Sequence, residues 1–299
     1  MNLKELKSPI RMYWDLPETA SDPGPYLNVC EEILVLKILY LSLRDLSAPI
    51  SPACTGILDR LKGKNLALSL TLSGPALVPS RPAGLSNAAI KTLLVNVSSF
   101  SEVRSLFENR ALDHNVGPLA GISFDVGKDN YREIPDVVSF CLGNGIRDLV
   151  FPIQRLTGAR DVFCLAEKER TELIERLGAL DHRAIRLTIH DPFLWQVFYP
   201  DIDYHEGGCQ AANSMLYVSP DLIVYPCPAM PVLLGDLHDT TLREIIQSEK
   251  KKELRRSLLD PPGECALCGR AGACLGGCRG RAFAALSSLD KRDPACTPI

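Results

Sequence analysis

Short apolar segments recur through the first two hundred residues. Seven of them are rich in Val, Ile, Leu or aromatic residues and have the length of strands: residues 10–16, 37–43, 65–71, 92–98, 120–126, 147–153 and 184–190. The first six begin at a nearly constant spacing of about 28 residues, and the seventh follows after a longer interval. This regularity indicates one supersecondary unit that is repeated along the chain.

Helical patterns lie between these strands. Residues 167–180 form the clearest one, because Leu173, Ile174 and Leu177 fall on one face. Residues 101–112 and 131–142 show weaker patterns. This alternation predicts an α/β fold with parallel strands and right-handed crossovers. Six or seven units fit a full or partial (β/α) barrel, and a doubly wound open sheet is the alternative.

Chemistry in either architecture is expected at the carboxyl ends of the strands. The polar residues at those positions are Asp15, Asp45, Asn96, Asp125 and Arg155. Each of them, taken alone, is more typical of a helix cap, a loop anchor or a satisfied polar group than of a catalyst. No glycine-rich phosphate loop and no nucleophile elbow follows any predicted strand. The sequence therefore leaves the catalytic residues unknown.

The composition is that of an ordinary globular protein, with 46% hydrophobic and 23% charged residues. A net charge of −3 argues against nucleic-acid binding, which needs a basic surface. No apolar run approaches the ~20 residues of a spanning helix, and the first residues lack the apolar core of a secretory signal. We therefore expect a cytoplasmic protein with reduced thiols.

Seven of the 11 cysteines follow residue 208. Four of these form a C-x2-C-x5-C-x3-C run that begins at Cys265. Thiolates this close repel one another without a cation among them, so the run indicates a metal site. Zinc and iron–sulfur clusters both take thiolate ligands, but the arrangement is not that of two zinc knuckles. The earlier cysteines share no ligand spacing and are expected to be small buried residues: Cys30, Cys54, Cys141 and Cys164.

The chain from about Gly207 onward resembles a SPASM domain, the auxiliary-cluster domain of many radical SAM peptide-modifying enzymes. The matching segments are GGCQAA at 207–212, VSPDLIVYPC at 218–227 and CLGGCRGRAF at 274–283, together with the cysteine spacing. The resemblance implies two [4Fe–4S] clusters with interleaved ligands. It assigns Cys209, Cys227 and Cys278 to the first cluster, and Cys265, Cys268, Cys274 and Cys296 to the second.

Two features depart from that pattern. The first cluster is one ligand short, and His205 is the favoured substitute ahead of Asp203 and Glu206. Leu222 stands where the family has glycine, so we expect the turn there to adopt another backbone conformation.

The N-terminal part resembles the radical SAM partial barrel, with residues 9–16 as its first strand. In that family a C-x3-C-x2-C loop follows this strand and binds the cluster that cleaves S-adenosylmethionine. Here the corresponding segment contains only Cys30, and the second strand lacks the glycine pair that contacts the cosubstrate. We expect residues 1–200 to form a degenerate barrel without an S-adenosylmethionine site, and residues 207–299 to form the SPASM domain.

This combination is similar to the GeoRSP-system SPASM domain proteins. The resemblance implies an accessory iron–sulfur protein that relays electrons or positions a peptide. It also implies three partners: a radical SAM/SPASM protein, a PqqD-like peptide chaperone and a peptide substrate. A non-radical enzyme that uses an open cluster site and a zinc-stabilised binding scaffold are the alternatives.

Residues 242–258 are expected to form one amphipathic helix, which begins at a capping box of Thr241 and Glu244. Its basic side chains are expected to form a solvated face, with a docking surface as the sharper alternative: Lys250, Lys251, Lys252, Arg255 and Arg256.

Overall fold

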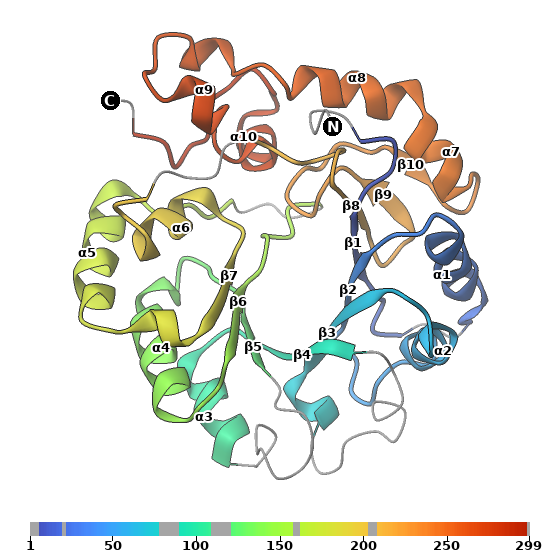
Figure 1. The fold of residues 1–299 in the computed structure, drawn as a ribbon, viewed down its shortest axis with the longest axis horizontal. Coiled ribbons are helices and arrows are strands. Elements are labelled where there is room, and N and C mark those ends of the chain that lie inside the picture. Colours follow the sequence, from blue (N-terminus) through green and yellow to red (C-terminus); the bar gives the residue numbers. More distant parts are fainter. Residues whose placement is uncertain are drawn as a thin grey trace.

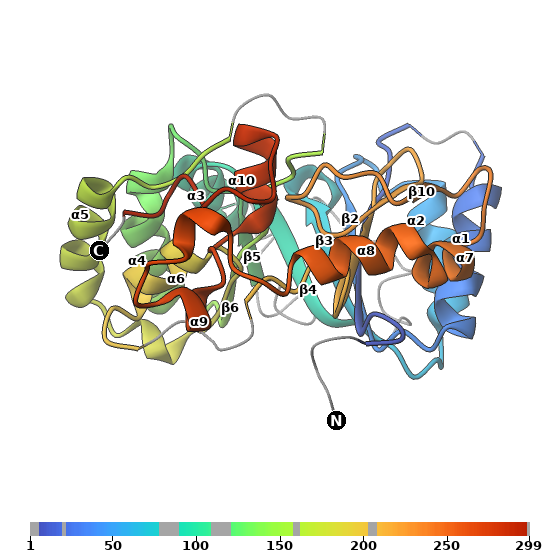
Figure 2. The same cartoon turned by 90° about the horizontal axis from the view of Figure 1, so that it is seen from above.

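The computed structural model describes residues 6–19, 22–77, 90–108, 121–157, 162–202 and 208–297. Figure 1 shows strands arranged around a centre, with helices on the outside of the ring that they form. The C-terminal elements cross the side of the ring that the parallel strands leave open (Figures 1 and 2).

Seven parallel strands form the main part of the sheet. They pair in chain order, so each strand lies beside the next one along the sequence. Their bounds are β1 Arg11–Asp15, β2 Tyr40–Asp45, β3 Ala67–Ser73, β4 Ile90–Val97, β5 Gly121–Phe124, β6 Asp148–Phe151 and β7 Arg186–Ile189. Each lies within or overlaps one of the seven predicted segments. The predicted α/β class and partial barrel are confirmed, and the sheet does not close, because β7 is one of its two edges.

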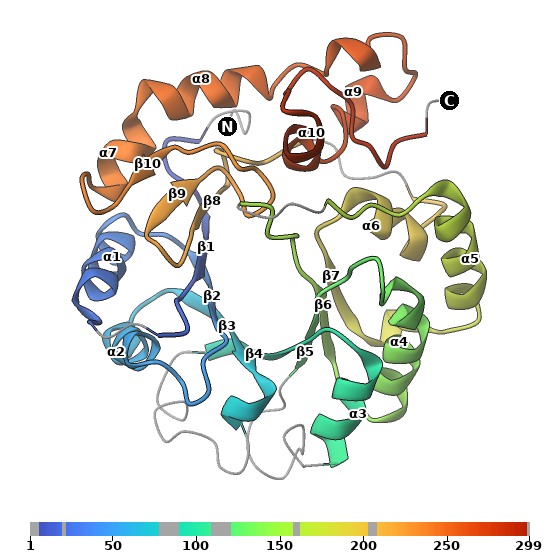
Figure 3. The ribbon, with the colours of Figure 1, turned by 180° about the vertical axis from the view of Figure 1, so that it is seen from behind.

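Helices cover the outer face of these strands, as Figure 3 shows from behind. They are α1 Gly24–Val35, α2 Pro52–Leu61, α3 Phe100–Glu108, α4 Ile134–Gly143, α5 Glu167–Gly178 and α6 Pro192–Phe198. The predicted helix at 167–180 matches α5. The one at 131–142 corresponds to a short 3-10 turn, η4 Tyr131–Glu133, followed by α4. The prediction for 101–112 matches α3, and its last four residues lie outside the described part of the chain.

Alternation within the strands separates an apolar outer face from a polar inner one. In β1, Met12 and Trp14 are fully buried in the hydrophobic core, whereas Arg11 and Tyr13 line an interior cavity. The other strands repeat this division, because successive side chains of a strand point to opposite faces. The interior of the partial barrel is therefore lined by polar groups.

The C-terminal part extends the same sheet. Its elements are β8 Met215–Val218, β9 Ile223–Tyr225, β10 Gly235–Asp236, α7 Leu242–Gln247, α8 Glu249–Ser257, η6 Gly263–Cys265, α9 Ala271–Cys274 and α10 Arg279–Leu286. Strand β8 pairs in parallel with β1, and the antiparallel strands β9 and β10 follow it. The two predicted domains thus share one continuous sheet.

The predicted helix at 242–258 is interrupted at Ser248, which has extended backbone (ψ 147°) and caps α8 with its side chain. The expected solvated basic face is wrong for Lys251 and Arg255, each only 2% exposed. Arg255 donates a hydrogen bond to the carbonyl oxygen of Cys209, which explains why the helix packs inward here. Among the described residues, no helix is both long and apolar enough to cross a membrane.

Candidate metal centre

The cysteines after residue 208 gather into two sets. The first contains Cys227, whose thiol interacts electrostatically with the thiols of Cys209 and Cys278. Burial is the largest cause that raises the pKa of Cys227 well above the usual thiol value, and the two neighbouring thiols raise it further. Burial likewise raises the pKa of Cys278 to about 12. A raised pKa keeps these thiols protonated unless a nearby cation stabilises the thiolate form.

The second set contains Cys265, Cys268, Cys274 and Cys296. The thiol of Cys265 interacts with those of Cys268 and Cys274. The thiol of Cys296 interacts with all three, although it lies in the C-terminal segment. This grouping is the one that the resemblance implies.

Left-handed backbone brings Cys274 and Cys278 into different sets. The three residues Leu275, Gly276 and Gly277 all have positive φ, which reverses the chain between the two cysteines. A Cβ atom at Gly276 would lie 2.6 Å from Cδ of Pro262, so only glycine fits there. The short C-x3-C spacing can therefore serve two sites.

Backbone amides point at the thiols of the first set. The N–H groups of Ala229 and Met230 donate to Cys227 and lower its pKa, against the larger effect of burial. The amide of Arg281 lies 3.4 Å from Sγ of Cys278. Such N–H donors stabilise thiolates, and hydrogen bonds to the ligand sulfurs are one of the controls on the potential of a cluster.

A buried cation lies between the two sets. Arg279 is 2% exposed, and its terminal nitrogens donate to the carbonyl oxygens of Ser257, Asp260 and Leu289. Within the described chain no carboxylate lies within 4 Å of it, and its Nε has no hydrogen-bond partner. Burial lowers the pKa of Arg279, while the thiols of Cys209 and Cys265 and the more distant carboxylates of Asp290 and Asp260 act in the opposite direction.

A buried guanidinium is costly without a negative partner. Thiolates ligating a metal would supply that negative charge on both sides of Arg279. The donor set therefore fits metal–thiolate sites, and an iron–sulfur cluster bound there would supply one-electron transfer. No three His, Cys, Asp or Glu side chains among the described residues have the spacing of a site for one metal ion.

A second buried arginine holds this region together. Arg281 forms two hydrogen bonds of 2.8 Å with Asp293 and an ion pair with Asp191. Asp293 is fully buried and also accepts the amide of Cys278 at 2.7 Å. Asp191 caps α6 by accepting the amide of Leu194 at 2.9 Å. The network thus joins the barrel, Cys278 and the segment that leads to Cys296.

The fourth ligand of the first set is not decided by the described residues. His205, Asp203 and Glu206 lie outside them.

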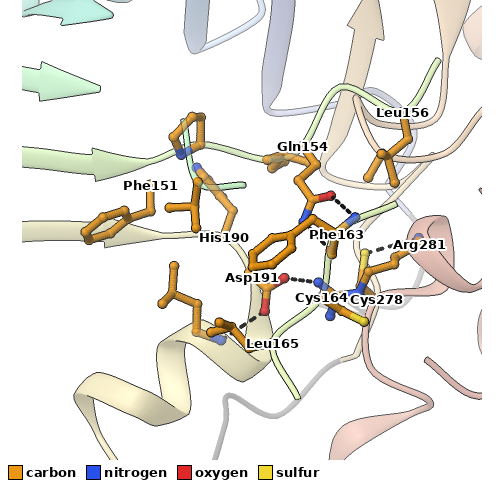
Figure 4. Close-up of a pocket in the computed structure, with 15 residues that line it drawn as sticks. Phe151, Gln154, Leu156, Phe163, Cys164, Leu165, His190, Asp191, Cys278 and Arg281 are labelled. Carbon is orange, nitrogen blue, oxygen red and sulfur yellow. Dashed lines mark hydrogen bonds and ion pairs between the residues drawn. The ribbon is translucent and has the colours of Figure 1, made fainter. Parts of the chain in front are cut away.

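Of the early cysteines, Cys30, Cys54 and Cys141 are fully buried, as expected. Cys164 is only half-buried and lines the same cavity as Cys278 (Figure 4). The sequence does not indicate that Cys164 lies near Cys278, because the two cysteines are far apart in the chain and have no ligand spacing.

The expectation for Leu222 is wrong. Its φ is +59°, the left-handed conformation that glycine favours, so the turn keeps the geometry that glycine would adopt. The side chain is 2% exposed and belongs to the hydrophobic core. Burial of the leucine therefore offsets the cost of the left-handed backbone, which is about 1–2 kcal/mol.

Four of the predicted strand-end residues come together inside the barrel. Arg155 forms two 3.0 Å hydrogen bonds with Asp15. Arg44 joins this pair to the others, because it donates to Asp125 at 2.7 Å and to Asn96 at 3.1 Å.

Two residues of this network were not predicted from the sequence. One is Arg44, and the other is Tyr217, which donates to Asp15 at 3.2 Å. Asp45 lies outside the network as a loop anchor that accepts the amides of Ser47 and Ser51.

Comparison with known proteins identifies the C-terminal region. Residues 209–269 match the SPASM family, described as an iron-sulfur cluster-binding domain. This part of the chain is therefore similar to an iron-sulfur cluster-binding domain. A stretch of 92 residues is 35% identical to the AdoMet-dependent heme synthase of Methanosarcina barkeri, which is 30% of this chain and 25% of that one. The chain therefore spans about a quarter of that curated relative.

Solved structures match over almost the whole chain. Streptococcus suis SuiB superposes with a TM-score of 0.69 and 13% identity, over 99% of this chain and 78% of that one. Native anSMEcpe with bound AdoMet gives 0.62 and 15%, over 96% and 93%. At these identities the likeness shows a shared fold.

We predict that the two thiol sets bind metal separately. Replacing one thiol of a set removes a ligand that the others cannot supply, so Cys227→Ala and Cys268→Ala should each lower the iron content of anaerobically prepared protein by about half. Cys141→Ala, a buried cysteine outside both sets, is the control and should retain all the iron. Complete loss of iron from either variant would instead show that the two sites assemble as one unit.

The strain at Leu222 can be isolated by two truncations. Leu222→Ala removes most of the buried side chain and leaves the strain of the left-handed backbone. Leu222→Gly removes the side chain and also relieves this strain. The glycine variant should be about 1 kcal/mol more stable than the alanine variant, and both should be less stable than wild type by about 2 kcal/mol or more. Denaturant unfolding measures both differences. Equal stability of the two variants would argue against strain at this position.

Removing the buried charge of Arg281 should destabilise the protein strongly. Arg281→Met leaves Asp191 and Asp293 without their common partner, which should cost about 3–5 kcal/mol in the free energy of unfolding. The exposed Arg243 on α7 offers a matched control, because Arg243→Met removes the same charge at the surface. A similar small effect of both substitutions would contradict the assigned role of the network.

Proposed function

We propose that this chain is an accessory iron–sulfur protein that holds two [4Fe–4S] clusters and works with a radical SAM enzyme in peptide modification. The observation that carries this proposal is a contrast between two parts of the molecule. The SPASM region brings seven thiols into two sets, whereas the loop after β1 has no thiol with which to hold a third cluster.

The end of β1 supports this contrast in detail. No cysteine lies between Asp15 and Cys30 in the sequence, and Cys30 is fully buried within α1. Asp15 itself is tied to Arg155 and Tyr217. Radical cleavage of S-adenosylmethionine is chemistry of the cluster rather than of the protein scaffold. We therefore infer that the radical is generated on a separate protein.

The partners follow from the same reasoning. A radical SAM/SPASM protein would supply the radical, and a PqqD-like chaperone would deliver the peptide. One solved neighbour, native anSMEcpe, is described with both AdoMet and a peptide bound, which supports a peptide substrate for this fold. A reducing cytoplasm would keep the seven thiols available for metal.

Electron relay is the favoured role. Arg279 interacts with a thiol of each set, so one buried charge acts on both sets. Clusters bound there would be close enough to share its field, which stabilises added negative charge. A peptide-positioning role would instead depend on the barrel surface.

A non-radical enzyme is the second candidate. One observation favours it: the first set has three described thiols, and one of them, Cys278, lines a cavity together with His190 and Cys164. An iron without a fourth protein ligand there would be open to a small molecule.

We predict about eight irons per chain after anaerobic reconstitution and no 5′-deoxyadenosine from S-adenosylmethionine with the isolated protein. Co-expression with its radical SAM partner should give a stable complex by size exclusion, and peptide modification only in that complex. Cys268→Ala should retain the complex and lose modification if the clusters relay electrons.

Three results would count against the proposal. Tightly bound zinc without iron would support the zinc-stabilised scaffold. Turnover by the isolated chain would support the non-radical enzyme. Cleavage of S-adenosylmethionine above a cofactor-free control would show that the barrel itself is a radical site.

A further inference from the structure

The partial barrel encloses a cavity of about 340 Å³ that no function described above uses. Residues from all seven parallel strands line it. Its volume lies at the lower end of the range for small-molecule sites. Closed (β/α) barrels fill this space with packed apolar side chains, so an open polar interior calls for an occupant.

The walls of this cavity are rich in hydroxyl groups. They come from five different strands: Ser42, Ser69, Thr71, Thr92, Ser123 and Thr188. A hydroxyl can donate or accept a hydrogen bond, and none of these side chains carries a negative charge. The lining therefore suits a polar ligand and does not repel an anion.

Positive charge dominates the charged side chains of the lining. Three of the five cations are neutralised: Arg44 by Asp125, Arg155 by Asp15 and Arg186 by Asp148. The other two are Arg11 and Lys91. Within the described part of the chain, neither has a carboxylate within 4 Å.

Arg11 and Lys91 flank one aromatic ring. The guanidinium carbon of Arg11 lies 5.5 Å from the centre of the Tyr40 ring, and Nζ of Lys91 lies 5.8 Å from it. A ring face attracts a cation but supplies no anionic partner. Tyr40 and Lys91 are exposed, so these charges stand at the mouth of the cavity, at the amino ends of β2 and β4.

Tyr13 and His190 lie at the inner end of the cavity. Arg11 donates to the hydroxyl of Tyr13 at 3.1 Å, and that hydroxyl lies 3.5 Å from Nε2 of His190. Burial, with help from Arg11 and Arg155, lowers the pKa of His190 to about 3, so its ring is neutral. Tyr13 also interacts electrostatically with Cys227, so the inner end of the cavity lies near the first thiol set.

We propose that the barrel interior binds a small anionic ligand, with its carboxylate or phosphate group held by Arg11 and Lys91 and its polar body hydrogen-bonded to the wall hydroxyls. The ligand enters at the amino ends of the strands. Binding of this ligand does not depend on which metal the thiol sets hold. The proposed site can therefore be tested independently of the proposed function.

Calorimetric titration of the full, anaerobically prepared protein tests this site. Succinate and inorganic phosphate are the two probes, and succinamide is the uncharged counterpart of succinate. We expect saturable binding of at least one anion, with the better probe distinguishing carboxylate from phosphate, and no binding of succinamide. Added salt should weaken the binding, because the mouth charges are exposed.

Variants at the mouth provide the decisive comparison. Arg11→Met and Lys91→Met should each weaken binding of the anion by about tenfold, the effect of losing one charge-assisted hydrogen bond. Arg11→Lys should retain most of the affinity and guards against misfolding as the cause of a loss. Lys64→Met, an exposed lysine outside the cavity, should bind as wild type does. Unsaturable binding of both anions, or equal affinity in the two mouth variants and wild type, would overturn the proposal.

Discussion

Arg281 is the contact on which the C-terminal half of the structure depends. Its guanidinium is buried between Asp191 of the barrel and Asp293 of the C-terminal segment. Asp293 in turn holds the amide of Cys278, and its carbonyl oxygen accepts the amide of Cys296. One buried charge cluster therefore fixes a thiol from each set relative to the sheet. A buried pair of this kind is costly to break, because either partner alone would remain charged without compensation.

The thiol sets themselves place a second electrostatic demand on the fold. Burial is the main cause that raises the pKa values of five of these thiols, which belong to Cys209, Cys227, Cys265, Cys278 and Cys296. A metal group held by these cysteines would displace their thiol protons and would add negative charge near Arg279. Metal binding there would therefore be coupled to the stability of this region. The backbone amides that face Cys227 and Cys278 are already oriented for the charged state.

The strands share the fold of the solved structural neighbours, and polar side chains line their interior. The carboxyl end of β1 is occupied by the Asp15–Arg155 pair rather than by thiols. The same interior holds a cavity lined by hydroxyl groups, and at its mouth are two cations, Arg11 and Lys91, that have no carboxylate within 4 Å among the described residues. We propose that the C-terminal thiol sets carry redox chemistry and that the strands bind a ligand, within one continuous sheet that joins β8 to β1.

The sequence determined the local and repeated features. Strand periodicity predicted the strands β1 to β7, since each of them satisfies its own alternation and spacing, but it did not predict β8, which also pairs in parallel. The cysteine spacing and its resemblance to a known domain predicted the two thiol sets. Even the polar inner face of the strands was present as alternation, for example in Ser42 and Ser69 beside buried leucines, although it was not recognised there. No pattern in the sequence indicates that Arg44 belongs to the polar network of the barrel or that Cys164 lies near Cys278.

Other features were decided only by tertiary structure. Leu222 keeps a left-handed turn because the core buries its side chain, which no local rule predicts. Lys251 and Arg255 are buried because the α8 face packs inward, so a basic run does not become a solvated face. The pairing of Arg281 with Asp191 joins residues far apart in the chain. Each of these depends on which surfaces meet, and that is set by the burial and charge compensation of the whole fold rather than by neighbouring residues.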